Sequence, residues 1–181
     1  LGTGVGLGIV CSGKIVMGSR GMIEGGHMIV EPGRNARSCP CGQRGCLEAH
    51  VSQTAVAAIA SERMKWNAEK NMMDDNPSAV TITAETVFAR AAQGDEVAME
   101  VVDETCSYIG LACFNLCRAL DPAAILLAGG LSKSEGLVEK VRQVAFSKRG
   151  WTLLPHECEI AIASTYERRL SGVMGAAGAA M

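Results

Sequence analysis

The chain has 181 residues, of which 48% are hydrophobic and 20% charged, and its formal net charge is −2. These values predict one large globular domain, or one and a half small ones, and exclude the strong basic field with which many proteins bind nucleic acid. No apolar run approaches the ~20 residues that span a bilayer, and the sequence has no signal-peptide pattern. We therefore expect a cytoplasmic protein with neither a membrane nor a nucleic-acid partner, in which the eight cysteines do not build a disulfide framework.

The chain begins with a glycine-rich segment, Leu1–Gly8, in which every second residue is glycine. Glycine lets backbone N–H groups approach phosphate oxygens closely, and Thr3 can add a hydroxyl. The segment is neither a Walker loop nor a dinucleotide fingerprint, and a tightly packed glycine strand is an equally good interpretation. We predict a β-hairpin with strands over residues 1–10 and Ile15–Gly18 and a turn at Cys11–Lys14.

Residues 19–47 are rich in Gly, Pro and Cys and would have little core of their own without a metal. Within them, three closely spaced cysteines follow a histidine, and the set consists of His27, Cys39, Cys41 and Cys46. Thiolates and imidazole are the ligands of closed structural Zn²⁺ sites, which usually have four ligands. The spacing therefore predicts a structural zinc site.

Two carboxylates, Glu24 and Glu48, flank the predicted zinc ligands. Carboxylates accept hydrogen bonds from hydroxyl groups and so are suited to binding sugars. Taken singly, each could equally be a solvated surface charge. Their positions beside the predicted metal ligands favour a binding role.

The rest of the chain alternates helical periodicity with short apolar runs. The expected elements are a helix from Glu48 to about Trp66, a surface loop over residues 67–80, a helix over Thr83–Ala92 capped by Thr83, a helix from Asp95 to about Leu120, a strand over Ala123–Ala128, a helix from Ser134 to about Ser147 capped by Ser132 or Ser134, a strand over Ile160–Ala163 and a helix over Leu170–Met181. This order predicts an α/β fold. Open α/β sheets bind ligands at the carboxyl ends of their strands, so Gly129 and Gly130 are candidate ligand contacts, although a plain turn is the alternative.

The remaining cysteines and histidines suggest no chemistry. Buried thiols behave as small apolar residues, and we expect core positions for Cys11, Cys106, Cys113, Cys117 and Cys158. His50 and His156 have no evident partners, and we expect them to be ordinary surface or core residues.

Taken in order, these motifs resemble those of the ROK family (repressors, open reading frames and sugar kinases). The similar segments are Leu1–Ile9, which is similar to the second phosphate-binding hairpin; Glu24–His27, which fits the Glu-x-Gly-His element; Cys39–Glu48, which fits the Cys-x-Cys-Gly-x-x-Gly-Cys-x-Glu zinc motif at every fixed position; Ala123–Ser132, which is similar to the adenosine-binding strand and turn; and the glycine- and alanine-rich C-terminal stretch. The zinc motif is the most specific of these. The ordered set therefore covers the whole chain.

The resemblance implies an actin-like, ribonuclease-H-like fold of two domains, of which this chain is mostly the larger, C-terminal one. It divides the chain into a phosphate-binding hairpin (1–20), a zinc and sugar-binding loop (24–48) and a nucleotide-side α/β region (121–181). It implies ATP- and Mg²⁺-dependent phosphorylation of a hexose, most simply glucose, and leaves a homodimer open.

The resemblance also implies roles for single residues. Zinc would be held by His27, Cys39, Cys41 and Cys46; the sugar would be contacted by Glu24, His27 and Glu48; and ATP would lie near Thr3, Gly4, Gly129 and Gly130. The family's catalytic base is an Asp that would lie upstream of Leu1, so no catalytic residue is named here. We therefore expect the chain to be a fragment, beginning inside a motif, that does not phosphorylate sugar by itself.

Several alternatives stay open. The same motifs are compatible with the sugar-sensing domain of a ROK-type transcription repressor, or with a kinase for N-acetylmannosamine, N-acetylglucosamine or fructose. A zinc-stabilised interaction module without a small-molecule role is a third class, but it does not explain the ordered set of motifs. The intact hairpin and Gly-Gly turn favour a kinase, because a repressor has less need of them.

Overall fold

The computed structural model describes residues 1–71, 82–147 and 158–163, with the side chains of residues 65–71 left aside. Its elements, in chain order, are β1 (Val10–Cys11), β2 (Lys14–Ile15), the 3-10 turn η1 (Gly25–His27), α1 (Glu48–Val51), α2 (Gln53–Asn71), α3 (Ala84–Ala92), α4 (Glu96–Leu120), β3 (Ala124–Leu127), the 3-10 turn η2 (Leu131–Lys133), α5 (Leu137–Ala145) and β4 (Glu159–Ile162). The mixture of helices with a parallel strand pair agrees with the predicted α/β class. Among the described helices, none is long and apolar enough to cross a membrane.

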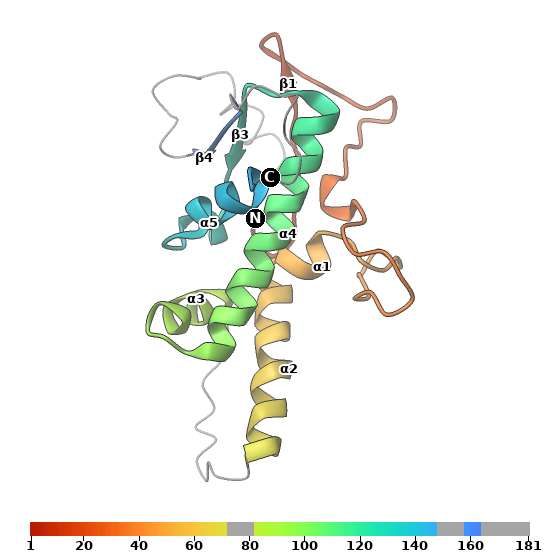
Figure 1. Cartoon of the computed structure of the whole chain (residues 1–181). Coiled ribbons are helices and arrows are strands. Elements are labelled where there is room, and N and C mark those ends of the chain that lie inside the picture. Colours follow the sequence, from red (N-terminus) through yellow and green to blue (C-terminus); the bar gives the residue numbers. More distant parts are fainter. Residues whose placement is uncertain (72–81, 148–157, 164–181) are drawn as a thin grey trace.

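The long helix α4 is the centre of the molecule, and α1, α2, α3 and α5 all pack against it (Figure 1). The carboxylate of Asp95 accepts a hydrogen bond from the backbone N–H of Ala98 at 2.9 Å and so caps the first turn. The helix ends at Leu120, and the C-cap residue Asp121, with a left-handed φ of 45°, lies immediately before Pro122. These are the predicted start and end of the helix.

The thiols on α4 lie in the core, as predicted. Cys106, Cys113 and Cys117 are all buried on the apolar face of the helix. The predicted core position of Cys11 is wrong. This thiol is exposed, because it lies next to the hairpin turn, where no other described element covers it. Cys158 is half-buried just before β4.

A small parallel sheet lies on one side of α4. β3 and β4 pair from Ala124↔Glu159 to Leu127↔Ile162, and α5 packs against β4. The predicted serine cap of α5 is wrong: the hydroxyl of Ser132 donates to the carbonyl of Gly129 at 2.8 Å, and α5 begins at Leu137 after Gly136 in a left-handed conformation. A glycine turn replaces the side-chain cap at this helix start.

The helix expected from Glu48 to Trp66 is two helices. Ser52 adopts an extended ψ of 155°, which ends α1. Its hydroxyl oxygen then accepts a hydrogen bond from the N–H of Ala55 at 3.1 Å, as an N-cap residue does at the start of a helix. α2 continues to Asn71, into the stretch predicted as a loop, whereas α3 has its predicted cap at Thr83. The helix expected over Leu170–Met181, and His156, lie outside the described residues.

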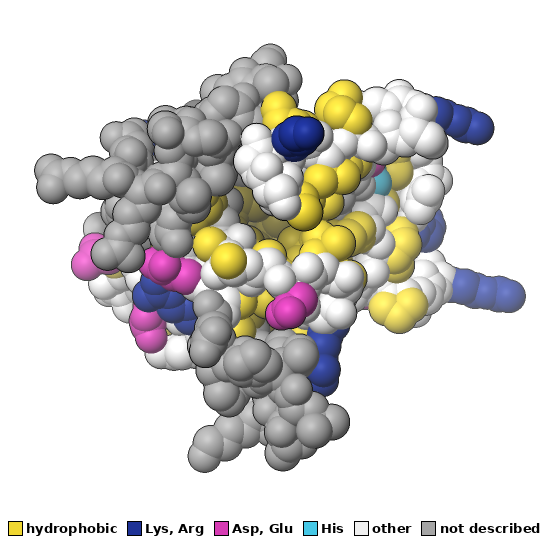
Figure 2. Space-filling view, turned by 90° about the horizontal axis from the view of Figure 1, so that it is seen from above, with side chains coloured by type: hydrophobic (Ala, Val, Ile, Leu, Met, Phe, Trp, Pro, Cys, Tyr) yellow, Lys and Arg dark blue, Asp and Glu magenta, His cyan; other side chains and the backbone are white. Residues whose placement is uncertain are grey.

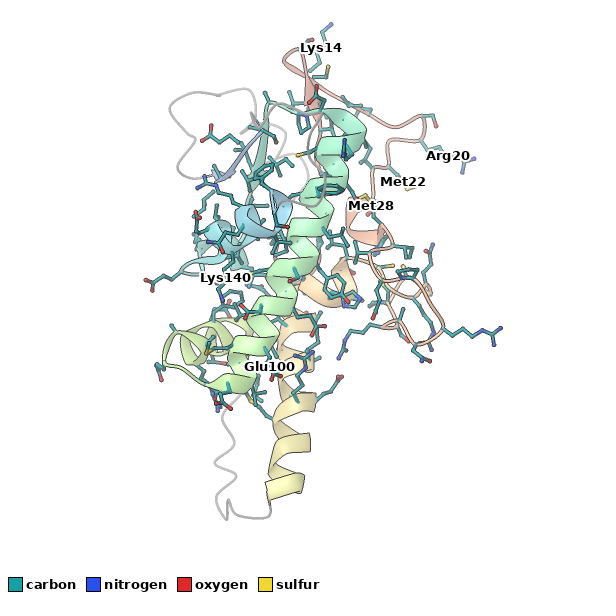
Figure 3. All side chains as sticks on the ribbon, viewed as in Figure 1. Lys14, Arg20, Met22, Met28, Glu100 and Lys140 are labelled. Atoms are coloured by element: carbon teal, nitrogen blue, oxygen red, sulfur yellow. The ribbon has the colours of Figure 1, made fainter. Side chains whose placement is uncertain are left out.

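The N-terminal hairpin is shorter than predicted. Val10 pairs with Ile15 and Cys11 with Lys14 around Ser12 and Gly13, both at positive φ, as in a tight hairpin turn. Lys14 lies at the hairpin tip (Figure 3), and Figure 2 shows the hydrophobic side chains that gather on this end of the molecule. Residues 1–9 are not assigned to a strand, and a further backbone hydrogen bond, from the N–H of Val16 to the carbonyl of Ile9 at 2.8 Å, extends the hairpin toward them.

Candidate functional site

The four predicted zinc ligands converge. One donor atom from each of His27, Cys39, Cys41 and Cys46 lies within 4.8 Å of every other. The Sγ atoms of Cys41 and Cys46 are 3.6 Å apart, and Nδ1 of His27 is 3.6 Å from Sγ of Cys39. A tetrahedral zinc with Zn–S bonds of about 2.3 Å would hold its sulfurs about 3.8 Å apart. Three thiols and an imidazole at this spacing therefore fit a structural Zn²⁺ ion.

Local backbone contacts bring these ligands together. The N–H of Cys39 donates to the carbonyl of Gln43 at 2.9 Å, and the N–H of Gly42 donates back to the carbonyl of Cys39 at 3.0 Å, which closes a tight turn. Isolated bridges join Ile29 to Cys46 and Ser38 to Arg44. The apolar cluster beneath the turn is small and consists of Cys39, Cys46 and Ala49. The loop thus has little core of its own, as predicted.

The thiols differ in their surroundings. Burial, followed by the neighbouring thiols Cys41 and Cys39, raises the pKa of Cys46 to about 12. The backbone hydrogen bond from Gln43 lowers the pKa of the exposed Cys41. A bound metal ion would compensate the charge of such a cluster, since coordinated thiols are deprotonated.

Gly45 should be the least replaceable glycine of this loop. Its φ is +74°, and a Cβ built on it would lie 1.8 Å from the carbonyl oxygen of Glu31, a backbone atom that cannot move aside freely. Gly42 is a matched control, with a φ of +90° and open space around its Cβ position. We expect Gly42→Ala to lower zinc affinity by at most about 30-fold, which corresponds to the 1–2 kcal/mol or so of a left-handed alanine, and Gly45→Ala to lower it at least about tenfold further. Competition with a chromophoric chelator measures both, and equal losses in the two variants would show that the clash is not what matters.

The sugar-contact candidates lie along one short segment. Oε2 of Glu48 accepts a hydrogen bond from the N–H of Val5 at 2.9 Å. A Cβ on Gly4 would lie 2.7 Å from that same oxygen, and one on Gly26 would lie 2.1 Å from the carbonyl oxygen of Val5. Residues 4–7 therefore lie between Glu48 and the turn Glu24–His27, and glycine is required at Gly26, where a side chain would meet the Val5 backbone.

The nucleotide-side candidates meet the same segment. The N-terminal amine of Leu1 donates to the carbonyl of Ala128 at 2.8 Å, and the N–H of Leu131 donates to the carbonyl of Leu1 at 3.3 Å. A Cβ on Gly129 would lie 2.4 Å from the carbonyl oxygen of Leu1. The Gly129–Gly130 turn after β3 is thereby placed next to the residues that lead into Thr3 and Gly4.

Two polar residues that the sequence did not single out also lie here. Nε2 of Gln53 donates to Oε1 of Glu85 at 2.9 Å, and a Cβ on Gly130 would lie 2.6 Å from Nε2 of Gln53. The N–H of Gln53 also donates to the carbonyl of Gly2 at 2.8 Å. No local motif marks Gln53 or Glu85, because their proximity arises only when α2 and α3 pack together.

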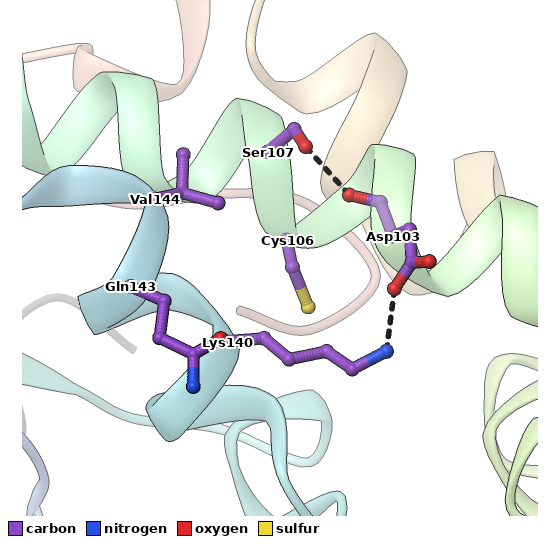
Figure 4. Close-up of a pocket in the computed structure, with 6 residues that line it drawn as sticks. All are labelled: Asp103, Cys106, Ser107, Lys140, Gln143 and Val144. Atoms are coloured by element: carbon purple, nitrogen blue, oxygen red, sulfur yellow. Dashed lines mark hydrogen bonds and ion pairs between the residues drawn. The ribbon is translucent and has the colours of Figure 1, made fainter. Parts of the chain in front are cut away.

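A hollow between α4 and α5 lies outside the predicted site. Its lining comprises Asp103, Cys106, Ser107, Lys140, Gln143 and Val144 (Figure 4). The ammonium of Lys140 pairs with the carboxylate of Asp103. Burial raises the pKa of Cys106 to about 11, so this thiol is protonated at neutral pH and is a poor nucleophile. We assign the hollow no catalytic role.

The comparison with protein families decides the classification. A model of the ROK family matches residues 1–181. This chain belongs to the ROK family. Among curated ROK relatives, the glucokinase of Halalkalibacterium halodurans is 41% identical over 145 residues, which are 79% of this chain and 44% of the relative. The N-acetylmannosamine kinase of Yersinia pestis is 32% identical over 176 residues, which are 97% of this chain and 53% of the relative. The chain thus spans about half the length of the curated relatives it matches.

Solved ROK structures agree with the described fold. The ROK hexokinase from Thermus thermophilus matches 99% of this chain with a TM-score of 0.76 and 27% identity, over 53% of its own length. A ROK family glucokinase from Streptomyces griseus, in complex with glucose and AMPPNP, matches 99% with a TM-score of 0.74 and 29% identity, over 57% of its length. A ROK family transcriptional regulator, a homolog of the E. coli MLC protein, matches 90% with a TM-score of 0.71 and 25% identity, over 40% of its length. The predicted α/β fold of the actin-like ATPase type is confirmed.

Proposed function

We propose that the protein to which this chain belongs is an ATP-dependent kinase that phosphorylates a hexose, with glucose as the preferred substrate. The observation that carries the proposal is the contact of the glycine-rich segment with both halves of the site. Val5 bonds to Glu48 beside the metal ligands, while Leu1 bonds to Ala128 beside the Gly-Gly turn. A kinase needs such an arrangement, because phosphoryl transfer depends on holding the sugar hydroxyl and the phosphates in fixed relative positions.

The sugar would be bound by the metal loop, residues 24–48. In this proposal, Glu24 and Glu48 accept hydrogen bonds from sugar hydroxyls. The Nδ1 atom of His27 faces the thiols, so Nε2 is the nitrogen proposed to contact the sugar. A bound zinc ion would fix the orientation of that ring, and Cys39, Cys41 and Cys46 would complete its coordination.

The nucleotide would be bound on the other side of the same segment. Thr3 and Gly4, in the hairpin region 1–20, are proposed to lie near the ATP phosphates with Mg²⁺. Gly129 and Gly130, in the region 121–181, are proposed to lie against the adenosine. We assign no general base to the described residues, and we propose that the isolated 181-residue chain binds ligands without turning over. A cytoplasmic setting, where ATP is supplied, is part of the proposal.

The experiment is a binding panel on the zinc-loaded chain by isothermal titration calorimetry. Glucose, N-acetylmannosamine, N-acetylglucosamine and fructose are titrated separately, each with and without a non-hydrolysable ATP analogue. We expect glucose to bind most tightly. Tighter binding of an N-acylated sugar would replace glucose as the substrate, and a chain that binds none of the four sugars would refute the sugar site.

The second candidate is a sugar sensor in a transcription repressor, which the likeness to the ROK regulator supports. The same titrations separate the two functions. A kinase binds the ATP analogue with Mg²⁺, whereas a pure sensor binds sugar alone. Sugar binding without any nucleotide binding would therefore favour the sensor.

A further inference from the structure

His50 is a buried titratable residue that the proposed sugar and metal contacts do not use. It lies in α1, the short helix that begins with Glu48, and only 2% of its surface is exposed. The sequence suggested an ordinary surface or core histidine. Its contacts show that it lies where three parts of the molecule meet.

The imidazole lies between the metal loop and α4. Its Nε2 atom is 3.2 Å from Oε2 of Glu31, in an orientation short of a regular hydrogen bond. On the other side, its ring centroid is 4.0 Å from that of Tyr108 on α4, with the rings tilted by 32°. His50 therefore joins a loop carboxylate to the central helix.

Glu31 in turn holds both arms of the metal loop. The N–H groups of Val30 and Glu31 donate to the carbonyl of Gly45, at 2.8 Å and 3.2 Å. The Glu31 carboxylate also accepts from the N–H of Arg37 at 3.2 Å. A displacement of Glu31 would thus shift the arm that carries His27 together with the arm that carries the cysteines.

The charges around His50 indicate its form at neutral pH. Burial is the largest effect and lowers the pKa of His50; the carboxylates of Glu31 and Glu104 oppose this shift, and the guanidinium of Arg37 adds to it. The ring is therefore neutral at pH 7 and carries one N–H donor. Nε2 is the ring nitrogen near the Glu31 carboxylate, at 3.2 Å, and the contact is a close polar approach without hydrogen-bond geometry. Tyr108, whose pKa is raised mainly by burial, remains an uncharged partner.

We propose that His50 is a positioning residue that locks the metal loop onto α1 and α4, so that His27 and Glu48 keep the separation that binding a sugar requires. This restraint by His50 acts on the metal loop and so on zinc binding. Its effect on sugar binding rests on the proposed function. The His50 ring has its close polar contact with Glu31 and not with a metal ligand, so in this proposal it acts through Glu31.

The test compares two replacements of His50 with a replacement of its partner. His50→Phe keeps a ring against Tyr108 but has no N–H, whereas His50→Gln keeps an N–H donor without the ring. Glu31→Gln removes the carboxylate at a half-exposed position and should leave folding intact. Each chain is loaded with zinc, and the rate of zinc loss to a chelator and the glucose Kd are measured at pH 7.

We expect His50→Phe and Glu31→Gln each to speed zinc loss about tenfold, the change that loss of one contact to a charged group produces. On a logarithmic scale, we expect the rate of zinc loss in His50→Gln to lie at least halfway from the rate in His50→Phe back to the wild-type rate. A purely space-filling role for His50 would not give this recovery. In the double variant His50→Phe/Glu31→Gln, the losses should not add, because both substitutions break one contact.

Two results would overturn the proposed positioning role of His50. One is a wild-type rate of zinc loss in Glu31→Gln. The other is a loss in His50→Gln as large as that in His50→Phe. If His50→Phe fails to fold, Glu31→Gln alone decides. A wild-type chain that binds no sugar would refute the proposed function instead. The rates of zinc loss would still test the positioning role of His50.

Discussion

Replacing Cys46 by serine is expected to remove tight zinc binding and to loosen residues 24–48 while leaving the helical core folded. Cys46 is fully buried, and its sulfur lies 3.6 Å from that of Cys41. Binding of structural zinc is worth about 10–16 kcal/mol in zinc-finger peptides at pH 7, so loss of one of four ligands should weaken affinity by at least about 100-fold. The metal content after gel filtration and a chelator competition measure this directly.

The core should survive this substitution because the loop contributes little to it. The main apolar cluster is built chiefly from α2 to α5 and β3, with α4 at its centre, and takes only Val30 and Leu47 from the loop, whereas Cys46 belongs to the small cluster with Cys39 and Ala49. Far-UV circular dichroism should therefore change little, while amide exchange in residues 24–48 should accelerate. Cys11→Ser, at an exposed thiol outside the metal loop, is the control and should retain wild-type zinc binding. A Cys46→Ser chain that retains one tightly bound zinc would refute the assigned ligand set.

Replacing Glu48 by glutamine is expected to weaken glucose binding about 10- to 100-fold. A hydrogen bond to a charged group is worth about 1.5–3 kcal/mol, and each 1.4 kcal/mol or so is a factor of ten in affinity. Glutamine keeps an oxygen that can accept the hydrogen bond from Val5, so the local backbone should hold. Calorimetric titration with glucose gives the change in Kd.

The control for this substitution is Glu139→Gln, an exposed carboxylate on α5 beside Arg142. It removes the same charge from the chain and should leave the glucose Kd unchanged. Zinc content should be normal in both variants, because Glu48 is not among the four metal ligands. Unaltered glucose binding in Glu48→Gln would remove Glu48 from the proposed sugar site.

Features set by neighbouring residues could be predicted from the sequence. The start and end of α4 follow from Asp95, Asp121 and Pro122, which act within one helical turn of the positions they control. The convergence of Cys39, Cys41 and Cys46 follows from their close spacing, because a tight turn is enough to gather them. Residues close in sequence therefore determine both the ends of α4 and the convergence of the cysteines.

Features set by distant contacts could not be predicted. The bond between Leu1 and Ala128 joins residues 127 positions apart, and no local pattern marks it. The contact of His50 with Glu31 and Tyr108 likewise depends on how the loop and α4 pack on α1. Ser52 is a different case: apolar periodicity runs across it and favours one continuous helix, whereas its extended ψ of 155° ends α1 there.

The most direct test of a zinc-stapled sugar site is a glucose titration of the same chain before and after metal removal. The zinc-loaded chain should bind glucose with a measurable Kd. The metal-free chain should bind at least about tenfold more weakly, and re-addition of one equivalent of zinc should restore the original affinity. Equal glucose affinity with and without zinc would contradict the account, because it would show that the metal loop does not position the groups that bind the sugar.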